Sequence, residues 1–181
     1  VNPRLVYCAL KGFLSGPYEQ RVALDEVVQM MGGLAYMTGP EGRPLRVGAS
    51  VNDVMGGLFG VVAIQAALWE RQHTGKGTFV RSGLFENNMF LVAQHMLQYR
   101  QTGVPAVPMP ERKSAWAVYD VFETADDENI FIGVVSDKQW AQFCNAFELH
   151  DLLQDEELHS NVQRVAQRDS FMPRLREMFK G

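Results

Sequence analysis

Cysteine and histidine are scarce in this chain of 181 residues, and neither type is clustered. Cys8 and Cys144 stand far apart and no Cys-x-x-Cys pair occurs, which argues against a disulfide framework and a structural zinc site. With two unpaired thiols we expect a reducing, cytoplasmic setting and no bound metal. The four histidines also lack the spacing of metal ligands, and we expect each to be a surface or helix-end residue; they are His73, His95, His150 and His159.

The chain also lacks runs of like charge and long apolar runs. Its formal net charge is -4 at pH 7 without a basic cluster, which argues against nucleic acid as a partner. No stretch of about 18 consecutive apolar residues occurs and no charged-then-apolar leader opens the chain, so we expect neither a membrane span nor a secretory signal. We expect the partner to be a small molecule or another protein chain. The first residue is Val1, and we expect the chain to be a piece of a longer one.

The sequence does have 46% hydrophobic residues, enough for a sizeable core. A short β-prone run, RLVYCAL, ends at a Lys-Gly pair as a buried strand does. Helical spacing follows in DEVVQMM, and a loop rich in Gly, Pro and Arg precedes a long apolar helix. We predict strands over residues 4–10 and 78–84, helices over 25–31, 52–71 and 85–100, and a loop over 39–48. This order predicts an α/β domain over residues 1–104.

The composition changes after Gly103. Three prolines within VPAVPMP predict a linker over residues 105–115. Beyond it, AWAVYDVFETADDENIFIGVVS predicts two strands joined by a polar turn, and residues 139–147 and 162–179 predict helices. We therefore expect a second, smaller α+β domain over residues 116–181.

The common nucleotide-binding and hydrolase motifs are incomplete. Gly75-Lys76 lacks the earlier glycine of a P-loop, where Glu70 stands, and the following Ser or Thr, where Gly77 stands. A dinucleotide-binding fingerprint fails at Met55, which takes the place of its first glycine. No serine lies within G-x-S-x-G.

The stretch GASVNDVMGG places a carboxylate at the head of a long apolar segment. Ser50 or Asn52 can cap a helix that begins here, and Asp53 is then a first-turn acid stabilised by the helix dipole. Gly56 and Gly57 each cost a helix interior roughly 0.8–1 kcal/mol relative to Ala, so something should require the close approach that they permit. An acid at the edge of such a crowded place can also act as a nucleophile. Spacing alone leaves both interpretations open.

The sequence around this aspartate resembles the family III CoA-transferases, the CaiB/BaiF group. The resemblance rests on RVALDEVVQMMGGLAYMTGPEGRPLRVGASVNDVMGGLFGVVAIQAALWERQHTGKG, on TFVRSGLFENNMFLV, on the hairpin YDVFETADDENIFIG and on the tryptophan helix DKQWAQFCNAF. It covers essentially the whole chain, although members of the family are roughly twice as long. It implies that residues 1–104 are part of a Rossmann-like parallel-sheet large domain and that residues 116–181 are an incomplete smaller α+β domain.

By this resemblance Asp53 matches the catalytic aspartate of the family. The resemblance implies that this carboxylate attacks an acyl-CoA thioester to form a mixed anhydride, which the CoA thiolate converts into an aspartyl-CoA thioester before an acceptor acid takes over the CoA. CoA and acyl-CoA are then substrates, and no cofactor is bound permanently. The resemblance also implies an interlocked homodimer.

Two alternative functions stay open. Racemases that resemble this group carry a His-Asp pair at the position of Leu24-Asp25, and leucine cannot move a proton, so the sequence favours transfer over racemisation or epimerisation. A chain that lacks the family's other parts can instead be a non-catalytic remnant or interaction module, which would have no need of Asp53.

Four more residues are candidates for binding acyl-CoA or the acid. Arg21 matches a basic position of the family and can meet a phosphate or an acid, or it is simply a surface residue. Asp25 either caps its own helix or lies beside the active site. Gln29 and Asn52 are candidates to donate hydrogen bonds to a thioester carbonyl.

Overall fold

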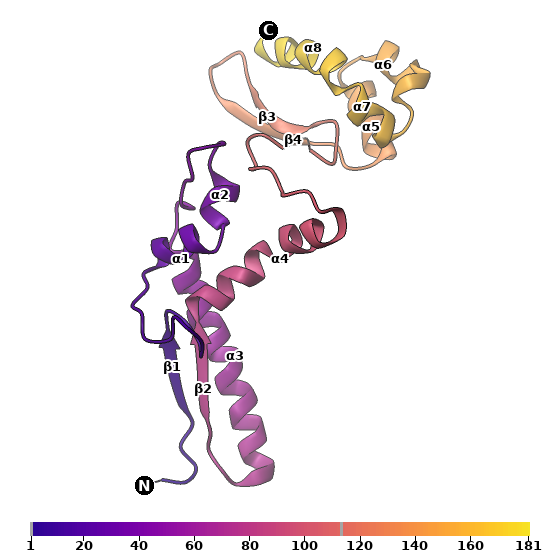
Figure 1. Ribbon diagram of the computed structural model, residues 1–181. Helices are drawn as coiled ribbons and strands as arrows, with labels where there is room; N and C mark the ends of the chain where they lie inside the picture. The colour runs from indigo at the N-terminus through magenta and orange to yellow at the C-terminus, as the bar shows by residue number, and fades with distance from the viewer. Residues whose placement is uncertain (1, 113) are drawn as a thin grey trace. The chain divides into compact units, whose positions relative to one another are not determined.

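The computed structural model describes residues 2–112 and 114–181. Val1, in the predicted large domain, and Lys113, in the predicted linker, lie outside the described residues. The chain divides into two compact units, Val1–Arg112 and Lys113–Gly181, which are described separately (Figure 1). The domain boundaries predicted from the sequence stay a prediction.

The first unit is a β-α-β arrangement around two parallel strands. Residue Tyr7 pairs with Phe79 and Lys11 with Gly83, so the two strands run in register in the same direction. Their arrowheads point toward α1 in Figure 1, and α3 packs along both strands. The elements are β1 (Tyr7–Lys11), α1 (Asp25–Met31), α2 (Leu34–Thr38), α3 (Val51–Thr74), β2 (Phe79–Gly83) and α4 (Leu84–Thr102).

Two glycines let α3 approach the sheet closely. A Cβ atom at Gly60 would lie 2.9 Å from Cδ2 of Leu10, and one at Gly56 would lie 2.9 Å from Cδ2 of Leu84. The hydroxyl of Ser82 on β2 donates a hydrogen bond of 2.9 Å to the carbonyl oxygen of Gly56. Glycine costs helix stability relative to alanine, and here it allows the backbone of α3 to approach β1 at Gly60 and the start of α4 at Gly56.

The predicted elements of this unit are confirmed with shifted ends. The first strand begins at Tyr7 rather than at residue 4, and residues 39–48 form a loop as predicted. The long helix continues to Thr74 and ends where Gly75 adopts a φ of 71°, a left-handed conformation that glycine enters without a Cβ clash. The sequence patterns did not reveal α2, a helix of only 5 residues.

By length and composition α3 could also cross a membrane, which was not expected from the sequence. An 18-residue window of α3 has a mean hydropathy of 1.5, and 22% of it is buried within the described structure. The core helix of a water-soluble protein passes the same test of length and composition. Within this unit α3 contacts β1 and β2 through Gly60 and α4 through Gly56.

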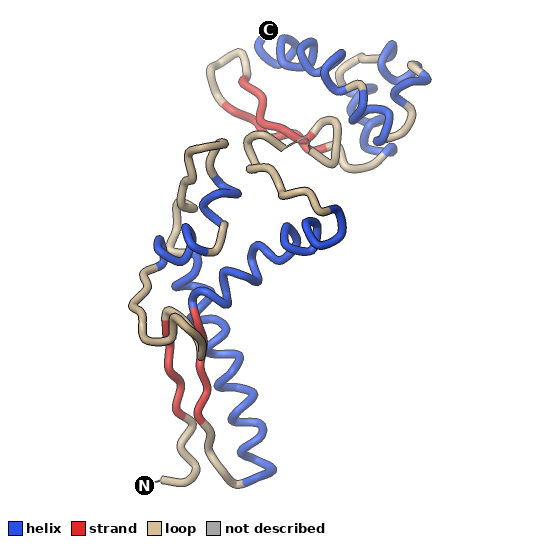
Figure 2. The backbone as a smooth tube through the Cα atoms, viewed as in Figure 1, coloured by secondary structure: helices blue, strands red, loops and turns tan. Residues whose placement is uncertain are grey.

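The second unit is a hairpin packed with short helices (Figure 2). Strand β3 (Tyr119–Glu123) pairs antiparallel with β4 (Asn129–Gly133), which confirms the predicted hairpin. Its core gathers buried side chains that include Phe122, Trp140 and Leu175. The helices are α5 (Asp137–Ala146), α6 (His150–Gln154), a 3-10 turn (Glu156–Leu158), α7 (Asn161–Ala166) and α8 (Arg168–Lys180).

The single helix predicted over residues 162–179 is wrong, because the structure has two helices there. Ser160 and Gln163 form a capping box that starts α7. The helix ends at Gln167, whose backbone leaves the helical region, and α8 begins at the next residue. The apolar spacing continues through the break, so periodicity alone did not reveal it.

Candidate active site

Asp53 lies in the first turn of α3 with its side chain exposed, beside a cavity of about 270 Å³. The cavity is lined by Leu10, Lys11 and Gly12 at the end of β1, by Leu84 directly after β2, and by Asp53 and Gly57 of α3. It therefore opens at the carboxyl ends of both parallel strands, which is where open α/β sheets bind their ligands.

The two glycines that follow Asp53 have different roles. Both line the cavity, but Gly56 also faces Leu84 and serves the packing of α3. A Cβ atom at Gly57 would have nothing within 4 Å, and Gly57 lines the cavity. Gly57 therefore leaves open space one turn from the carboxylate, whereas Gly56 allows a close approach.

The N-terminus of α3 is capped by a residue of another helix. The side chain of Ser50 makes no capping hydrogen bond. Instead, Oδ1 of Asp25 accepts hydrogen bonds from the backbone N–H groups of Asn52, at 2.7 Å, and Asp53, at 3.3 Å. Asp25 begins α1, yet it caps α3, so the expectations that Ser50 or Asn52 caps α3 and that Asp25 caps its own helix are wrong.

The other amides of this turn are also engaged. The N–H group of Val51 donates to the carbonyl oxygen of Ala49 and that of Val54 to the carbonyl oxygen of Ser50. The first-turn amides of α3 are thus occupied within the chain, although helix N-termini commonly offer such groups to anions.

Gln29 holds Asp25 in place. Its Nε2 donates to Oδ2 of Asp25 at 2.5 Å, and its Oε1 accepts a hydrogen bond of 2.8 Å from the N–H group of Val47. Asp25 is 5% exposed and Gln29 is 0% exposed. The structure places Gln29 in this buried network and not among the residues that line the cavity.

Asn52 is also fully buried. Within the described part of the chain its Oδ1 and Nδ2 have no hydrogen-bond partner, and the same holds for the side-chain amide of Asn88 on α4. Buried side-chain amides usually have hydrogen-bond partners, so these two asparagines are exceptions. The side chain of Asn52 does not line the cavity beside Asp53.

The structure does not bring Arg21 to the cavity. Arg21 is exposed, and its guanidinium carbon lies 4.6 Å from the ring centroid of Tyr18. Lys11 is among the residues that line the cavity, and its Nζ is paired with Oε1 of Glu19 at 3.1 Å. Lys11 was not among the residues expected at the site. Its position at the end of a predicted strand could have indicated it, because ligands bind at the carboxyl ends of parallel strands.

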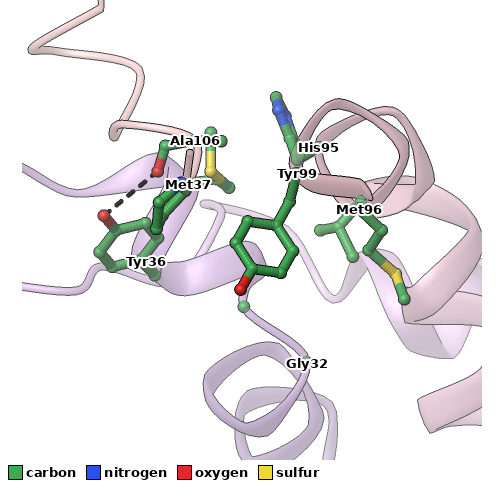
Figure 3. A pocket seen from close by; sticks show the side chains of 10 residues that line it. Gly32, Tyr36, Met37, His95, Met96, Tyr99 and Ala106 are labelled. Atoms are coloured by element: carbon green, nitrogen blue, oxygen red, sulfur yellow. Dashed lines mark hydrogen bonds between the residues drawn. The ribbon is translucent and has the colours of Figure 1, made fainter. Parts of the chain in front are cut away.

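A second cavity of about 400 Å³ lies elsewhere in the same unit (Figure 3). Tyr36, Met37 and Tyr99 line it, and the hydroxyl of Tyr36 donates to the carbonyl oxygen of Ala106 at 3.2 Å. His95 also lines it, midway along α4 and partly buried at the surface. Burial, and after it the charge of Arg112, lowers the pKa of His95.

The described residues 2–112 and 114–181 hold no group of three or more His, Cys, Asp or Glu side chains that could bind a metal ion. The carboxylate of Asp53 and the open space over Gly57 are the features with which this cavity can do chemistry. A carboxylate beside a cavity can attack an electrophilic carbonyl group.

Comparison with known proteins identifies the family. The family model described as "CoA-transferase family III" matches residues 1–181. The chain is 32% identical over 168 residues to a succinate–glutarate CoA-transferase of Agrobacterium fabrum, covering 92% of this chain and 42% of that protein. It is 32% identical over 178 residues to an acetyl-CoA:oxalate CoA-transferase of Acetobacter aceti, covering 97% and 46%.

The fold agrees with the sequence comparison. A crystal structure of a CaiB/BaiF family protein from Brucella suis matches with a TM-score of 0.82 and 32% identity, covering 99% of this chain and 48% of that one. The predicted fold class, part of a larger CaiB/BaiF α/β fold, is confirmed. The chain spans about half the length of the relatives that it matches. It belongs to CoA-transferase family III.

Proposed function

We propose that the complete protein moves CoA from an acyl-CoA donor to a carboxylic acid acceptor, with Asp53 as the covalent nucleophile. The observation that carries this proposal is the exposed carboxylate of Asp53 beside a cavity at the carboxyl ends of β1 and β2. The chain's membership of CoA-transferase family III supplies the reaction class.

The first half-reaction loads CoA onto the protein. The carboxylate of Asp53 attacks the thioester carbonyl, the carbon–sulfur bond breaks, and CoA leaves as a thiolate. The thiolate then attacks the aspartyl carbonyl of the mixed anhydride and releases the donor acid as a carboxylate. Asp53 now carries CoA as a thioester, and no water is consumed.

The second half-reaction reverses these steps with the acceptor. Its carboxylate attacks the aspartyl thioester and displaces the CoA thiolate, which gives a second mixed anhydride. The thiolate attacks the acyl carbonyl of the acceptor, and the Asp53 carboxylate leaves. Exclusion of water from the cavity matters because water would hydrolyse either activated intermediate.

The cavity offers one feature that suits these steps. Gly57 leaves space beside the carboxylate for an acyl group or the pantetheine arm. Negative charge develops on the thioester oxygen during each attack and calls for a hydrogen-bond donor. Because the first-turn amides of α3 are occupied, they do not hold this oxyanion.

We further propose short dicarboxylic acids as the substrate class. The relatives from Agrobacterium fabrum and Acetobacter aceti are named for succinate, glutarate and oxalate. A cavity of about 270 Å³ fits a short acid better than a long acyl chain. Transfer from succinyl-CoA to glutarate or oxalate should therefore exceed transfer to hexanoate, and an equal rate with hexanoate would overturn this choice.

The proposal includes a homodimer in the cytoplasm. Five large apolar side chains on α3 are at least half exposed, a pattern that favours burial against another chain or segment; they are Val54, Leu58, Val61, Val62 and Trp69. Cys8 and Cys144 are both free thiols, which fits a reducing compartment. Light scattering of the complete protein tests the dimer, and a monomeric mass would contradict it.

Substitution of Asp53 tests the proposed function. The complete protein and its Asp53→Ala and Asp53→Asn variants are assayed with succinyl-CoA and the acid panel, and Glu70→Gln, an exposed acid on the same helix, is the matched control. We expect both Asp53 variants to lose at least about a thousandfold in kcat while the control keeps its rate. Transfer that survives both substitutions would refute the proposal, and exchange of the α-proton without CoA transfer would favour racemisation.

A further inference from the structure

Asp25 is the buried acid of the site, and its carboxylate reaches from α1 to the start of α3. Residues 25, 28 and 29 are the buried residues of α1, so its short buried face presents Asp25 and Gln29 one turn apart. Asp25 is 5% exposed and does not line the cavity beside Asp53. Asp25 can therefore influence a substrate only through the backbone amides of α3 that it binds.

The hydrogen bonds of Asp25 limit the partners that are available to the carboxylate of Asp53. An aspartate near a helix start commonly turns its carboxylate back onto free backbone N–H groups. In α3 the N–H groups of Asn52 and Asp53 are already bonded to Oδ1 of Asp25. With those donors occupied, the carboxylate of Asp53 stays off its own helix and faces the cavity.

Gln29 fixes the other oxygen of Asp25. The contact of 2.5 Å between Nε2 and Oδ2 leaves Oδ1 to face α3, and Oε1 of Gln29 receives the N–H group of Val47 at 2.8 Å. The segment that leads into α3 is thereby tied to the same pair of side chains. A buried carboxylate with three donors is held much more rigidly than an exposed one.

We propose that Asp25, oriented by Gln29, is a positioning residue that occupies the first-turn amides of α3 and so keeps the Asp53 carboxylate free to attack the thioester. This inference rests on the proposed function of Asp53. Its kinetic consequence is specific: loss of Asp25 lowers kcat, because fewer Asp53 carboxylates are in the attacking geometry, and leaves KM unchanged.

An exchange of chemical groups between the two side chains provides the test. In Asp25→Asn the new amide nitrogen meets Nε2 of Gln29, two donors face each other, and the network breaks. In Gln29→Glu two carboxylates face each other. The double variant Asp25→Asn/Gln29→Glu restores one donor and one acceptor and keeps the total charge, while the amide oxygen introduced at position 25 can again accept from α3.

The complete protein and these variants are compared in kcat, KM and thermal midpoint, with succinyl-CoA and glutarate as substrates. We expect each single variant to lose about 10- to 100-fold in kcat with KM unchanged within about twofold. The double variant should recover to within about threefold of wild type, because the two positions are energetically coupled. Asp25→Ala adds a backbone readout: the amides of Asn52 and Asp53 should exchange hydrogen at least about tenfold faster.

The possible results separate the two claims. Single variants that keep the wild-type kcat, or that change KM alone, would refute the positioning role and leave the role of Asp53 intact. A double variant that regains the thermal midpoint but not kcat would also refute it, since a purely structural network would then suffice. No transfer by the wild-type protein would refute the proposed function, and the positioning role with it.

Discussion

Gly57 offers a substitution in which stability and activity should move in opposite directions. It lies inside α3, and a Cβ atom there would meet nothing within 4 Å. Alanine is more favourable than glycine in a helix interior by roughly 0.8–1 kcal/mol, and no contact opposes this gain. The free energy of unfolding of Gly57→Ala should therefore rise by about that amount, which raises the melting temperature.

The same methyl group enters the cavity beside Asp53. We expect the transfer rate of Gly57→Ala to fall about tenfold, and that of Gly57→Leu, which adds four carbons, by at least about a hundredfold, because the thioester is displaced from the carboxylate. Gln65→Leu places the same side chain at an exposed position of α3 away from the cavity and should keep the wild-type rate.

Calorimetry and the CoA-transfer assay measure the two effects on the same preparations. A lower melting temperature for Gly57→Ala would show that Gly57 is not in open space. A Gly57→Leu variant with the wild-type rate would show that the reacting thioester lies elsewhere. Either result would refute the reasoning from this cavity.

Three more predictions concern other parts of the chain. A Cβ atom at Gly77 would lie 1.9 Å from the carbonyl oxygen of Leu5, so Gly77→Ala should lower the free energy of unfolding by about 1–3 kcal/mol in urea titrations; no loss would contradict this contact. Burial raises the pKa of Cys144 to about 11, so a disulfide reagent at pH 8 should label it only after unfolding, and rapid labelling of the native protein would refute its burial. Burial and Arg112 lower the pKa of His95, so the unfolded chain binds more protons and stability falls as the pH drops below about 6.5; His95→Gln should flatten this dependence in urea unfolding between pH 5 and 7, and an unchanged slope would contradict it.

Local patterns in the sequence predicted the elements around the site. The run RLVYCAL, the long apolar segment after Asp53 and the stop at His73–Gly77 each carry their structural signal within a few residues, and the structure has a strand, a helix and a helix end there. Periodicity and turn residues act locally, which is why they can be read without knowledge of the fold. The placement of Asp53 in the first helical turn follows from the same signals.

Contacts between distant segments could not be read in this way. Asp25 and Asn52 are 27 residues apart, and nothing in either local pattern shows that one caps the helix of the other. The position of Lys11 on the cavity depends on β1 and β2 ending side by side. Likewise, α2 is too short to show a helical period, and its start follows Gly33, whose φ of 82° sets a turn that the sequence alone does not specify.

Chemical trapping on Asp53 tests the covalent mechanism most directly. The complete protein is incubated with succinyl-CoA, treated with hydroxylamine, digested, and mapped by mass spectrometry, with Asp53→Asn treated in parallel. Hydroxylamine cleaves an aspartyl anhydride or thioester to a hydroxamate, so we predict a hydroxamate at Asp53 that requires succinyl-CoA and is absent from the variant. An unmodified Asp53 in a protein that transfers CoA would contradict the central claim that this carboxylate carries the CoA.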